Sequence, residues 1–384
     1  MANNNENKIL NVPHLRFPEF SGEWDSFKLV ELGKFIGGGT PSSSNLSFWT
    51  GSIPWISSSD IKEDNINNIS ISRYITEDAI EKSATKYCPA PVILIVSRVG
   101  VGKVALSHTS LCTSQDFCNI IDIKCHPVFL SYNLLRTMKR KSREVQGTSI
   151  KGITSDELQK IRVFIPKNKD EQNKISNLLT LLDERIVTQN KIIEDLKKLK
   201  SAISLNVLHS DTWEQFKIKD IAKIGRGRVI SSIEISQQKN PTYPVYSSQT
   251  SNNGIMGYLD DYMFEGEHIS WTTDGANAGT VFYRNGKFNC TNVCGLLKFR
   301  KEFDTYFVSL VLAEATKKYV SINLANPKLM NNTMGNIQIR LPKLEEQKRI
   351  SIVFRELQKL WTVHNSLLTK YTKQKQYLLS QMFI

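Results

Sequence analysis

A segment with apolar residues at heptad spacing occurs twice in this chain of 384 residues. The first covers residues 175–207 and the second residues 350–382, with apolar positions a constant 175 residues further on. Apolar residues that alternate at intervals of four and three form a narrow stripe on a helix, and a partner helix must cover that stripe. The chain contains one other segment of matching length, so we expect the two helices to pack on each other in antiparallel orientation.

The two stripes match even in their polar exceptions. Gln189 stands where the second stripe has His364, and Lys200 stands where it has Lys375. The alternative is two unrelated amphipathic helices in separate cores, which the shared register, length and exceptions disfavour. The residues expected in the interhelical seam are Leu179, Leu182, Ile186, Ile193, Phe354, Leu357, Trp361 and Leu368.

The duplication extends beyond the helices. Residues 24–29 (Trp-Asp-Ser-Phe-Lys-Leu) return as residues 213–218 (Trp-Glu-Gln-Phe-Lys-Ile). Each copy later has an apolar strand that enters a glycine turn, and each ends with an apolar strand, a Pro-Lys pair and a Glu-Gln pair that opens the helix. The corresponding segments are 95–102 with 269–279, and 161–172 with 337–347.

This pattern predicts an α+β fold with a pseudo-two-fold internal repeat. Two globular domains are expected to be separated by the two long helices, which form an antiparallel coiled coil. The expected segments are a disordered lead (1–13), a first globular domain (14–160), a strand with the first long helix (161–211), a second globular domain (212–336) and a strand with the second long helix (337–384).

Charge narrows the class of partner. Lys and Arg total 50 against 37 acidic residues, which gives a net charge of +13 and favours a polyanionic partner. The longest apolar runs, such as residues 91–96, are far too short to span a bilayer. Residues 1–7 are polar and lack the apolar core of a signal peptide, so we expect a cytoplasmic protein that binds nucleic acid rather than a membrane.

The sequence contains no complete motif for catalysis or cofactor binding. Residues 97–104 resemble a phosphate-binding P-loop, but that loop needs glycine in place of Ser97 and a magnesium-binding hydroxyl in place of Val104. There is no Pro-Pro pair of the kind an adenine methyltransferase uses, and no GxGxxG follows a strand. The six cysteines contain no CxxC pair, so burial in strands is favoured over a metal site. We therefore expect no catalytic residue, no metal site and no cofactor in this chain.

Short polar and basic side chains beside glycines are suited to reading bases. Glycine lets the backbone approach a groove closely, arginine reads guanine, asparagine and glutamine read adenine, and other basic residues hold phosphates. The alternative is that these stretches are only loops. It is the better interpretation for any single residue, whereas the set as a whole favours base reading. The candidates are Gly38, Gly39, Thr40, Ser42, Ser58, Arg98 and Lys103 in the first domain and Arg226, Arg228, Ser247, Ser248, Asn253, Thr273 and Asn277 in the second.

The order of these motifs resembles the specificity subunit of Type I restriction–modification systems. Residues 38–42 (Gly-Gly-Thr-Pro-Ser), with Phe-Trp at 48–49 and Ile-Pro-Trp at 53–55 downstream, are similar to the opening of a first target-recognition domain in that family. Residues 243–248, 253–258 and 274–279 resemble a second such domain. The junctions that open the long helices are similar to the two conserved regions of the family. The resemblance extends from about residue 13 to residue 384.

The resemblance implies a bipartite DNA target, with one half-site for each recognition domain and an unread spacer between them. It also implies partners: double-stranded DNA, two modification (methyltransferase) subunits that methylate adenine with S-adenosylmethionine, and restriction subunits that use ATP and magnesium to cleave DNA. One departure is that the first Gly-Gly-Thr-Pro loop is replaced by Gly-Arg-Gly-Arg at 225–228 in the second domain. Two other functions stay open, a stand-alone DNA-modifying enzyme and a coiled-coil scaffold without a DNA role.

Overall fold

The computed structural model describes residues 11–145, 152–321 and 326–384. The chain forms two compact units. Unit 1 comprises Met1–Lys191 with Ser366–Ile384, and unit 2 comprises Ile192–Asn365. The expected disordered lead (1–13) falls mostly on residues 1–10, which lie outside the described residues.

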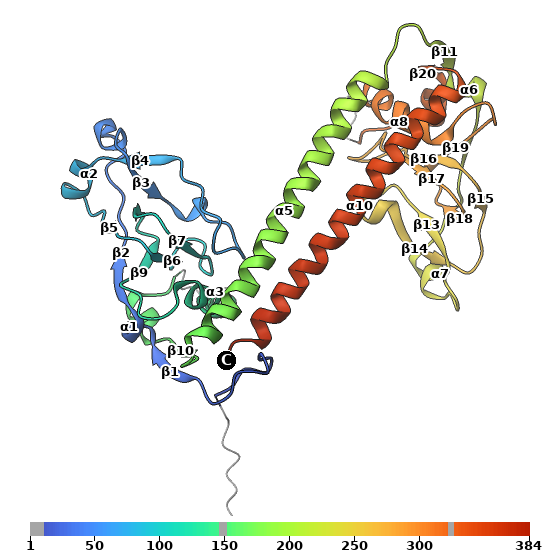
Figure 1. The fold of residues 1–384 in the computed structure, drawn as a ribbon. Coiled ribbons are helices and arrows are strands. Elements are labelled where there is room, and N and C mark those ends of the chain that lie inside the picture. Colours follow the sequence, from blue (N-terminus) through green and yellow to red (C-terminus); the bar gives the residue numbers. More distant parts are fainter. Residues whose placement is uncertain (1–10, 146–151, 322–325) are drawn as a thin grey trace, which may run out of the picture. The chain divides into compact units, whose positions relative to one another are not determined.

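Strands and helices are mixed in both units, as Figure 1 shows. The strands of unit 1 are β1 (Asp25–Lys28), β2 (Lys34–Gly37), β3 (Ile53–Ile56), β4 (Arg73–Ile75), β5 (Tyr87–Cys88), β6 (Val92–Val96), β7 (Val104–Ser107), β8 (Leu111–Thr113), β9 (Phe117–Ile121) and β10 (Arg162–Ile165). Its helices are α1 (Leu29–Leu32), α2 (Glu77–Glu81), α3 (Pro127–Val145) and α4 (Ser155–Lys160), with the 3-10 turns η1 (Leu46–Trp49) and η2 (Ser58–Asp60).

Unit 2 has a matching set. Its strands are β11 (Glu214–Lys217), β12 (Ala222–Arg226), β13 (Tyr243–Tyr246), β14 (Ile255–Leu259), β15 (Phe264–Glu265), β16 (His268–Thr272), β17 (Val281–Arg284), β18 (Lys287–Cys290), β19 (Cys294–Phe299) and β20 (Gln338–Leu341). Its helices are α6 (Ile218–Ile221), α7 (Ser232–Ser236), α8 (Thr305–Ala315) and α9 (Asn331–Asn336), with the 3-10 turns η3 (Ser251–Gly254) and η4 (Thr316–Lys318).

The sheets of the two units have the same topology. In unit 1 the strand orders are β2-β9-β6-β7 and β4-β3-β8-β5, and in unit 2 they are β12-β19-β16-β17 and β14-β13-β18-β15. The only parallel pairs among the described strands, β3 with β8 and β13 with β18, also correspond. The internal repeat predicted from the sequence is therefore a repeat of the fold, of α+β class.

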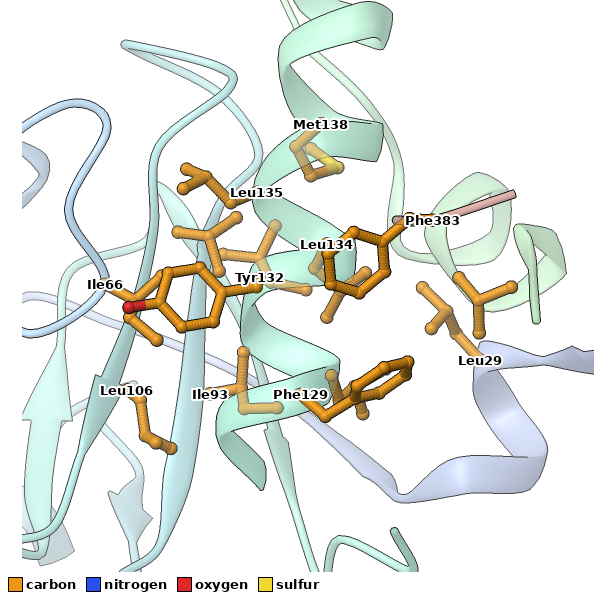
Figure 2. Close-up of a cluster of buried hydrophobic side chains, with 14 of the residues drawn as sticks. Leu29, Ile66, Ile93, Leu106, Phe129, Tyr132, Leu134, Leu135, Met138 and Phe383 are labelled. Carbon is orange, nitrogen blue, oxygen red and sulfur yellow. The ribbon is translucent and has the colours of Figure 1, made fainter. Parts of the chain in front are cut away.

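In each unit one helix packs on the four-stranded sheet with the longer strands, β2-β9-β6-β7 in unit 1 and β12-β19-β16-β17 in unit 2, which is called the larger sheet below. In unit 1, α3 presents Phe129, Tyr132 and Leu135 to Ile93 and Leu106 of the sheet (Figure 2). In unit 2, α8 packs Phe307, Val308 and Leu312 in the core with Ile269 and Trp271 of β16. The tryptophan at the start of each copy joins these cores, since Trp24 meets Phe129 edge to face at 5.7 Å and Trp213 meets Phe307 at 5.8 Å.

The two long helices, α5 (Lys169–Val207) and α10 (Leu344–Gln381), each contribute one end to each unit. In unit 1 they are antiparallel, because Asp183 pairs with Lys375 while Arg185 donates to the hydroxyl of Tyr371 at 3.2 Å. In unit 2, Ile203 and Val207 of α5 share a core with Ile350 and Phe354 of α10.

The residues predicted for the seam differ in burial. Leu179, Leu182, Ile193, Phe354 and Leu357 are buried, whereas Ile186, Trp361 and Leu368 are half-buried. The seam as a whole stays a prediction. The polar exceptions break the symmetry, since Lys375 is buried against Asp183 in unit 1 whereas Lys200 is exposed.

The start of each long helix is anchored to its globular core by a glutamine. Gln172 donates from Nε2 to the Pro166 carbonyl at 2.8 Å and accepts from the His126 amide at 3.0 Å. Gln347 does the same with the Pro342 carbonyl at 2.8 Å and the Asp304 amide at 2.9 Å. Proline ends the strand and the buried glutamine satisfies backbone groups that would otherwise lack partners. This explains why the proline and the glutamine recur at the start of both long helices.

Within the described residues, the structure contains no helix that is both long and apolar enough to span a membrane.

Candidate DNA interface

The glycine-rich segments occupy the same place in both units. Each follows the edge strand of the larger sheet and crosses to a short connector between two strands. The Gly39 amide donates to the Thr113 carbonyl at 2.8 Å, and the Arg228 amide donates to the Cys290 carbonyl at 3.2 Å. Gly38 therefore corresponds to Gly227, and the flanking pair Gly37 and Gly39 corresponds to Arg226 and Arg228.

The shared glycine is required by a close approach of two backbones. A Cβ atom on Gly38 would lie 2.0 Å from the Ser114 carbonyl oxygen, and one on Gly227 would lie 1.5 Å from that of Cys290. No side chain fits at either position. Gly37 is free to differ, because a Cβ there would meet nothing within 4 Å, and its counterpart is Arg226. Gly39 is buried and a Cβ there would lie 2.4 Å from the Ala84 carbonyl oxygen, whereas its counterpart Arg228 is exposed.

Three loops meet at this point in unit 1. Thr40, after the glycines, contacts Gln115 of the connector through its hydroxyl. The amides of Ser97 and Arg98, in the turn after β6, donate to the Asp116 carbonyl at 2.8 and 3.3 Å. The connector 114–116 thus ties the glycine-rich segment to the β6–β7 turn, and the Arg98 side chain is exposed beside it.

The other candidates of unit 1 lie on adjoining segments. Lys103 donates from Nζ to the Ser58 carbonyl at 3.0 Å, so these two predicted residues are brought together. Ser42 is held by contacts with its own loop, because its hydroxyl is 2.8 Å from that of Ser44 and its carbonyl accepts from Trp49 Nε1 at 3.1 Å.

Unit 2 repeats the arrangement with different side chains. Thr273, in the position of Ser97, donates from its hydroxyl to the Val293 carbonyl at 2.9 Å and is buried. Arg226 donates from Nε to Asn331 Oδ1 at 2.9 Å and from Nη1 to the Asn292 carbonyl at 3.4 Å. The connector 291–293 therefore plays the part of 114–116.

Arg228 is more accessible than Arg226. It makes a two-pronged ion pair with Glu234 of α7, with Nη1 2.9 Å from Oε2. Its side chain is nevertheless 44% exposed. The hydrogen bond from Arg228 lowers the pKa of the Glu234 carboxyl. The guanidinium is thus preorganised at the surface by an acceptor that a phosphate or a base edge could replace.

The remaining candidates of unit 2 lie on two turns. The Ser247 amide donates to the Gly254 carbonyl at 2.9 Å and closes the loop that contains Ser248. Asn253 in this loop has a positive φ of 53°, which asparagine tolerates better than most residues. Asn277 is exposed in the β16–β17 turn, where its carbonyl accepts from the Thr280 hydroxyl at 2.8 Å.

Sequence reasoning missed the two connectors and two arginine–aromatic contacts, that of the half-buried Arg73 and that of the buried Arg284. Arg73 lies 4.6 Å from the ring centre of Trp55 and pairs with Asp60. Arg284 lies 3.6 Å from the ring centre of Tyr246, and burial lowers its pKa. The repeat could have revealed the connectors, because residues 113–118 and 290–295 occupy matching places between corresponding strands. Nothing local in the sequence marks the arginines.

The cysteines are positioned as core residues. Cys88, Cys112, Cys118, Cys290 and Cys294 are buried on strands, and Cys125 is half-buried. Burial raises the pKa of Cys88 to about 11 and that of Cys112 to about 12, so both are protonated thiols at neutral pH. In the part of the chain that the structure describes, no group of three or more His, Cys, Asp or Glu residues could hold a metal ion.

The domains of this chain are similar to known proteins. A family model described as the Type I restriction modification DNA specificity domain matches twice, over residues 21–198 and 210–370. The N-terminus of a putative type I specificity subunit of Mycoplasma pneumoniae is 46% identical over 140 residues, which are 36% of this chain and 74% of that protein. The MpnII restriction enzyme specificity subunit of the same organism is 43% identical over 150 residues, 38% of this chain and 44% of that protein.

The fold also matches a solved structure. The S subunit of the Type I restriction–modification system of M. genitalium aligns over 97% of this chain and 99% of its own, with a TM-score of 0.70 and 18% sequence identity. At that identity the match shows a shared two-domain fold. The two matches to the family model cover most of the chain, so the protein belongs to the family of Type I restriction modification DNA specificity domains.

Proposed function

We propose that this chain reads a bipartite DNA sequence, one half-site with each globular domain, and directs partner subunits to it. The observation that carries the proposal is the doubled three-loop arrangement around Gly38 and Gly227. The framework is the same in both units, while the positions that flank the shared glycine differ in chemistry, with Gly37 and Gly39 in one and the half-buried Arg226 and exposed Arg228 in the other. Two such surfaces suit two different half-sites.

The partners follow from the same proposal. Adenine methylation by two modification subunits with S-adenosylmethionine, and cleavage by restriction subunits with ATP and magnesium, are assigned to other chains, so this chain needs no cofactor. It acts in the cytoplasm, where its net charge of +13 favours DNA over a neutral partner. We place the recognition domains at residues 14–160 and 212–336, with the strand-and-helix segments at 161–211 and 337–384 between and after them.

Exchanging residues 212–336 for the equivalent segment of a relative is expected to change one half-site of the methylated sequence and to leave the other unchanged. The reason is that each unit has its own sheets, core and glycine-rich segment. Methylome sequencing of cells that carry the exchanged gene measures both half-sites at once. New letters in both half-sites would contradict independent reading, and the loss of methylation from an otherwise folded complex would contradict the proposed function.

Arg228→Ala is expected to weaken DNA binding by about 1–3 kcal/mol if the arginine reads a base, with relaxed preference at one position. If it holds a phosphate, all sequences weaken alike and the salt dependence becomes shallower. Glu234→Gln is the matched control, because it removes the competing carboxylate while retaining the arginine, and it should strengthen binding at low salt. Binding isotherms at several salt concentrations measure both. An Arg228→Ala variant that binds like the parent would remove this residue from the interface.

A further inference from the structure

A short arm before β1 covers one side of unit 1. The Trp24 amide donates to the Asn11 carbonyl at 2.8 Å, and the Leu15 amide donates to the Gln381 carbonyl at the end of α10 at 2.9 Å. Phe17 packs against the hydrophobic core. Residues 11–23 therefore form an ordered layer over the junction where the long helices meet the globular domain.

Arg16 is the anchor of this arm. Its Nε and Nη2 atoms donate to the two carboxylate oxygens of Glu171 at 2.7 and 2.8 Å, and Nη1 donates to the Gly22 carbonyl at 2.6 Å. Trp24 Nε1 donates to the same carboxylate at 3.2 Å. Glu171 and Trp24 are each only 1% exposed, so the carboxylate is buried but fully paired. A planar guanidinium matches such a carboxylate better than an ammonium does.

Unit 2 has the same framework without the arm. Trp213 corresponds to Trp24 and Glu346 to Glu171, and the neighbouring glutamine contacts are duplicated. Only residues 209–212 separate the buried Leu208 from Trp213, a connection too short to form an equivalent layer. Glu346 is consequently exposed and Trp213 half-buried, and both line a cavity of about 710 Å³.

A second charged position is also unmatched. In unit 1, Lys174 pairs with Glu19 of the arm and lies 4.7 Å from the ring centre of Phe17. The corresponding residue of α10 is Arg349, one helical turn beyond Glu346. Arg349 is exposed and has no ion-pair partner within residues 11–145, 152–321 and 326–384. Glu346 and Arg349 thus present an acidic and then a basic group along α10. In unit 1 the corresponding Glu171 and Lys174 of α5 are paired with Arg16 and Glu19 of the arm.

We propose that the cavity between Trp213 and Glu346 binds an extended segment of another protein, with an arginine that pairs with Glu346 and an acidic residue three positions later that pairs with Arg349. The arm of unit 1 shows that this framework accepts a chain of that chemistry. Lys343 at the rim does not oppose the arginine, because its counterpart Lys167 in unit 1 pairs with Asp25, the residue that follows Trp24, while Arg16 pairs with Glu171. The inference concerns a protein contact and does not depend on DNA reading.

A fluorescently labelled peptide with the sequence of residues 11–23 tests the proposal on the full chain. The arm of the protein already fills the site in unit 1, so the peptide should occupy the cavity of unit 2. Fluorescence anisotropy is expected to show saturable binding that weakens by about tenfold or more in Glu346→Gln, because a two-pronged charged contact is lost. Glu345→Gln is the control, since this exposed neighbour lies outside the cavity and the charge change is the same. A peptide with lysine in place of its arginine should also bind more weakly.

Charge reversal supplies a second readout that a loss of folding cannot imitate. A peptide with lysine in place of its glutamate at the position of Glu19 should bind the parent chain weakly and should recover affinity for Arg349→Glu. Equal binding to the parent chain and to Glu346→Gln would overturn the proposal, as would a complete absence of peptide binding. Rescue by Arg349→Glu would fix the direction of the bound segment along α10.

Discussion

Gly227→Ala is expected to displace the end of β12 from its connector and to abolish reading of one half-site. The added Cβ would lie 1.5 Å from the Cys290 carbonyl oxygen. Neither atom can rotate away, because the Cβ is fixed to the backbone and the oxygen is part of it. Forcing an extra methyl into such a contact costs about 1–3 kcal/mol or more. Because Arg226 and Arg228 flank this glycine, their guanidinium groups move with it. Urea denaturation measures the stability of the chain, and methylome sequencing measures the half-site.

Gly225→Ala is the matched control, since a Cβ at that position meets nothing within 4 Å. It lies two residues earlier, within β12, and should leave stability and half-site unchanged. In unit 1, Gly38→Ala should abolish reading of the other half-site, because its Cβ would lie 2.0 Å from the Ser114 carbonyl oxygen. Gly37→Ala is its control, because a Cβ there is unobstructed. Gly227→Ala behaving like Gly225→Ala would show that the crossing is not closely packed.

Lys375→Met is expected to destabilise unit 1 by about 3–5 kcal/mol, because it leaves the Asp183 carboxylate buried without its cation. Both side chains are at most 4% exposed, and the Tyr132 hydroxyl donates to the other carboxylate oxygen at 2.8 Å. Burial raises the pKa of Asp183 and lowers that of Lys375 despite their mutual attraction. Desolvation therefore dominates, so the double variant Asp183→Leu with Lys375→Met should be close to the parent in stability.

The repeat provides the control for this pair. Lys200 occupies the corresponding place on α5 but is exposed, so Lys200→Met should change stability by less than about 0.5 kcal/mol. Hydrogen exchange in α3, which carries Tyr132, reports on unit 1 separately from unit 2. Equal effects of Lys375→Met and Lys200→Met would mean that the buried ion pair contributes nothing specific to unit 1.

The long helices and the duplication could be predicted because their signals are local and periodic. Heptad spacing and the Pro-Lys and Glu-Gln pairs lie within a few turns of each other, so the starts of α5 and α10 follow from the sequence. The burial of Lys375 could not be predicted, because it depends on Tyr132 from a distant helix. The counterpart of Tyr132 in unit 2 is Leu310, which carries no hydroxyl. Lys200 and Lys375 therefore look alike in the sequence but differ in burial in the fold.

The candidate interface was predictable only in part. Glycines beside polar residues identified the segments at 38–42 and 225–228, because close backbone approach demands glycine. The connectors that hold these segments lie about 65–75 residues further along the chain, and no short-range pattern links the two. The ion pair of Arg228 could not be predicted, because its partner Glu234 lies across a loop whose geometry the sequence does not reveal.

Unit 1 is assembled from two distant stretches of chain, and this has a consequence for the order of folding during synthesis. Phe383 packs on Phe129 with ring centres 5.1 Å apart, and Arg136 donates to the Ile384 carbonyl at 2.7 Å. The ribosome must therefore have produced residues 366–384 before the first-made domain can close its core. Unit 2, whose residues are contiguous, has all its contacts available earlier. The domain translated first is completed last, and until then its apolar surface is exposed to chaperones and proteases.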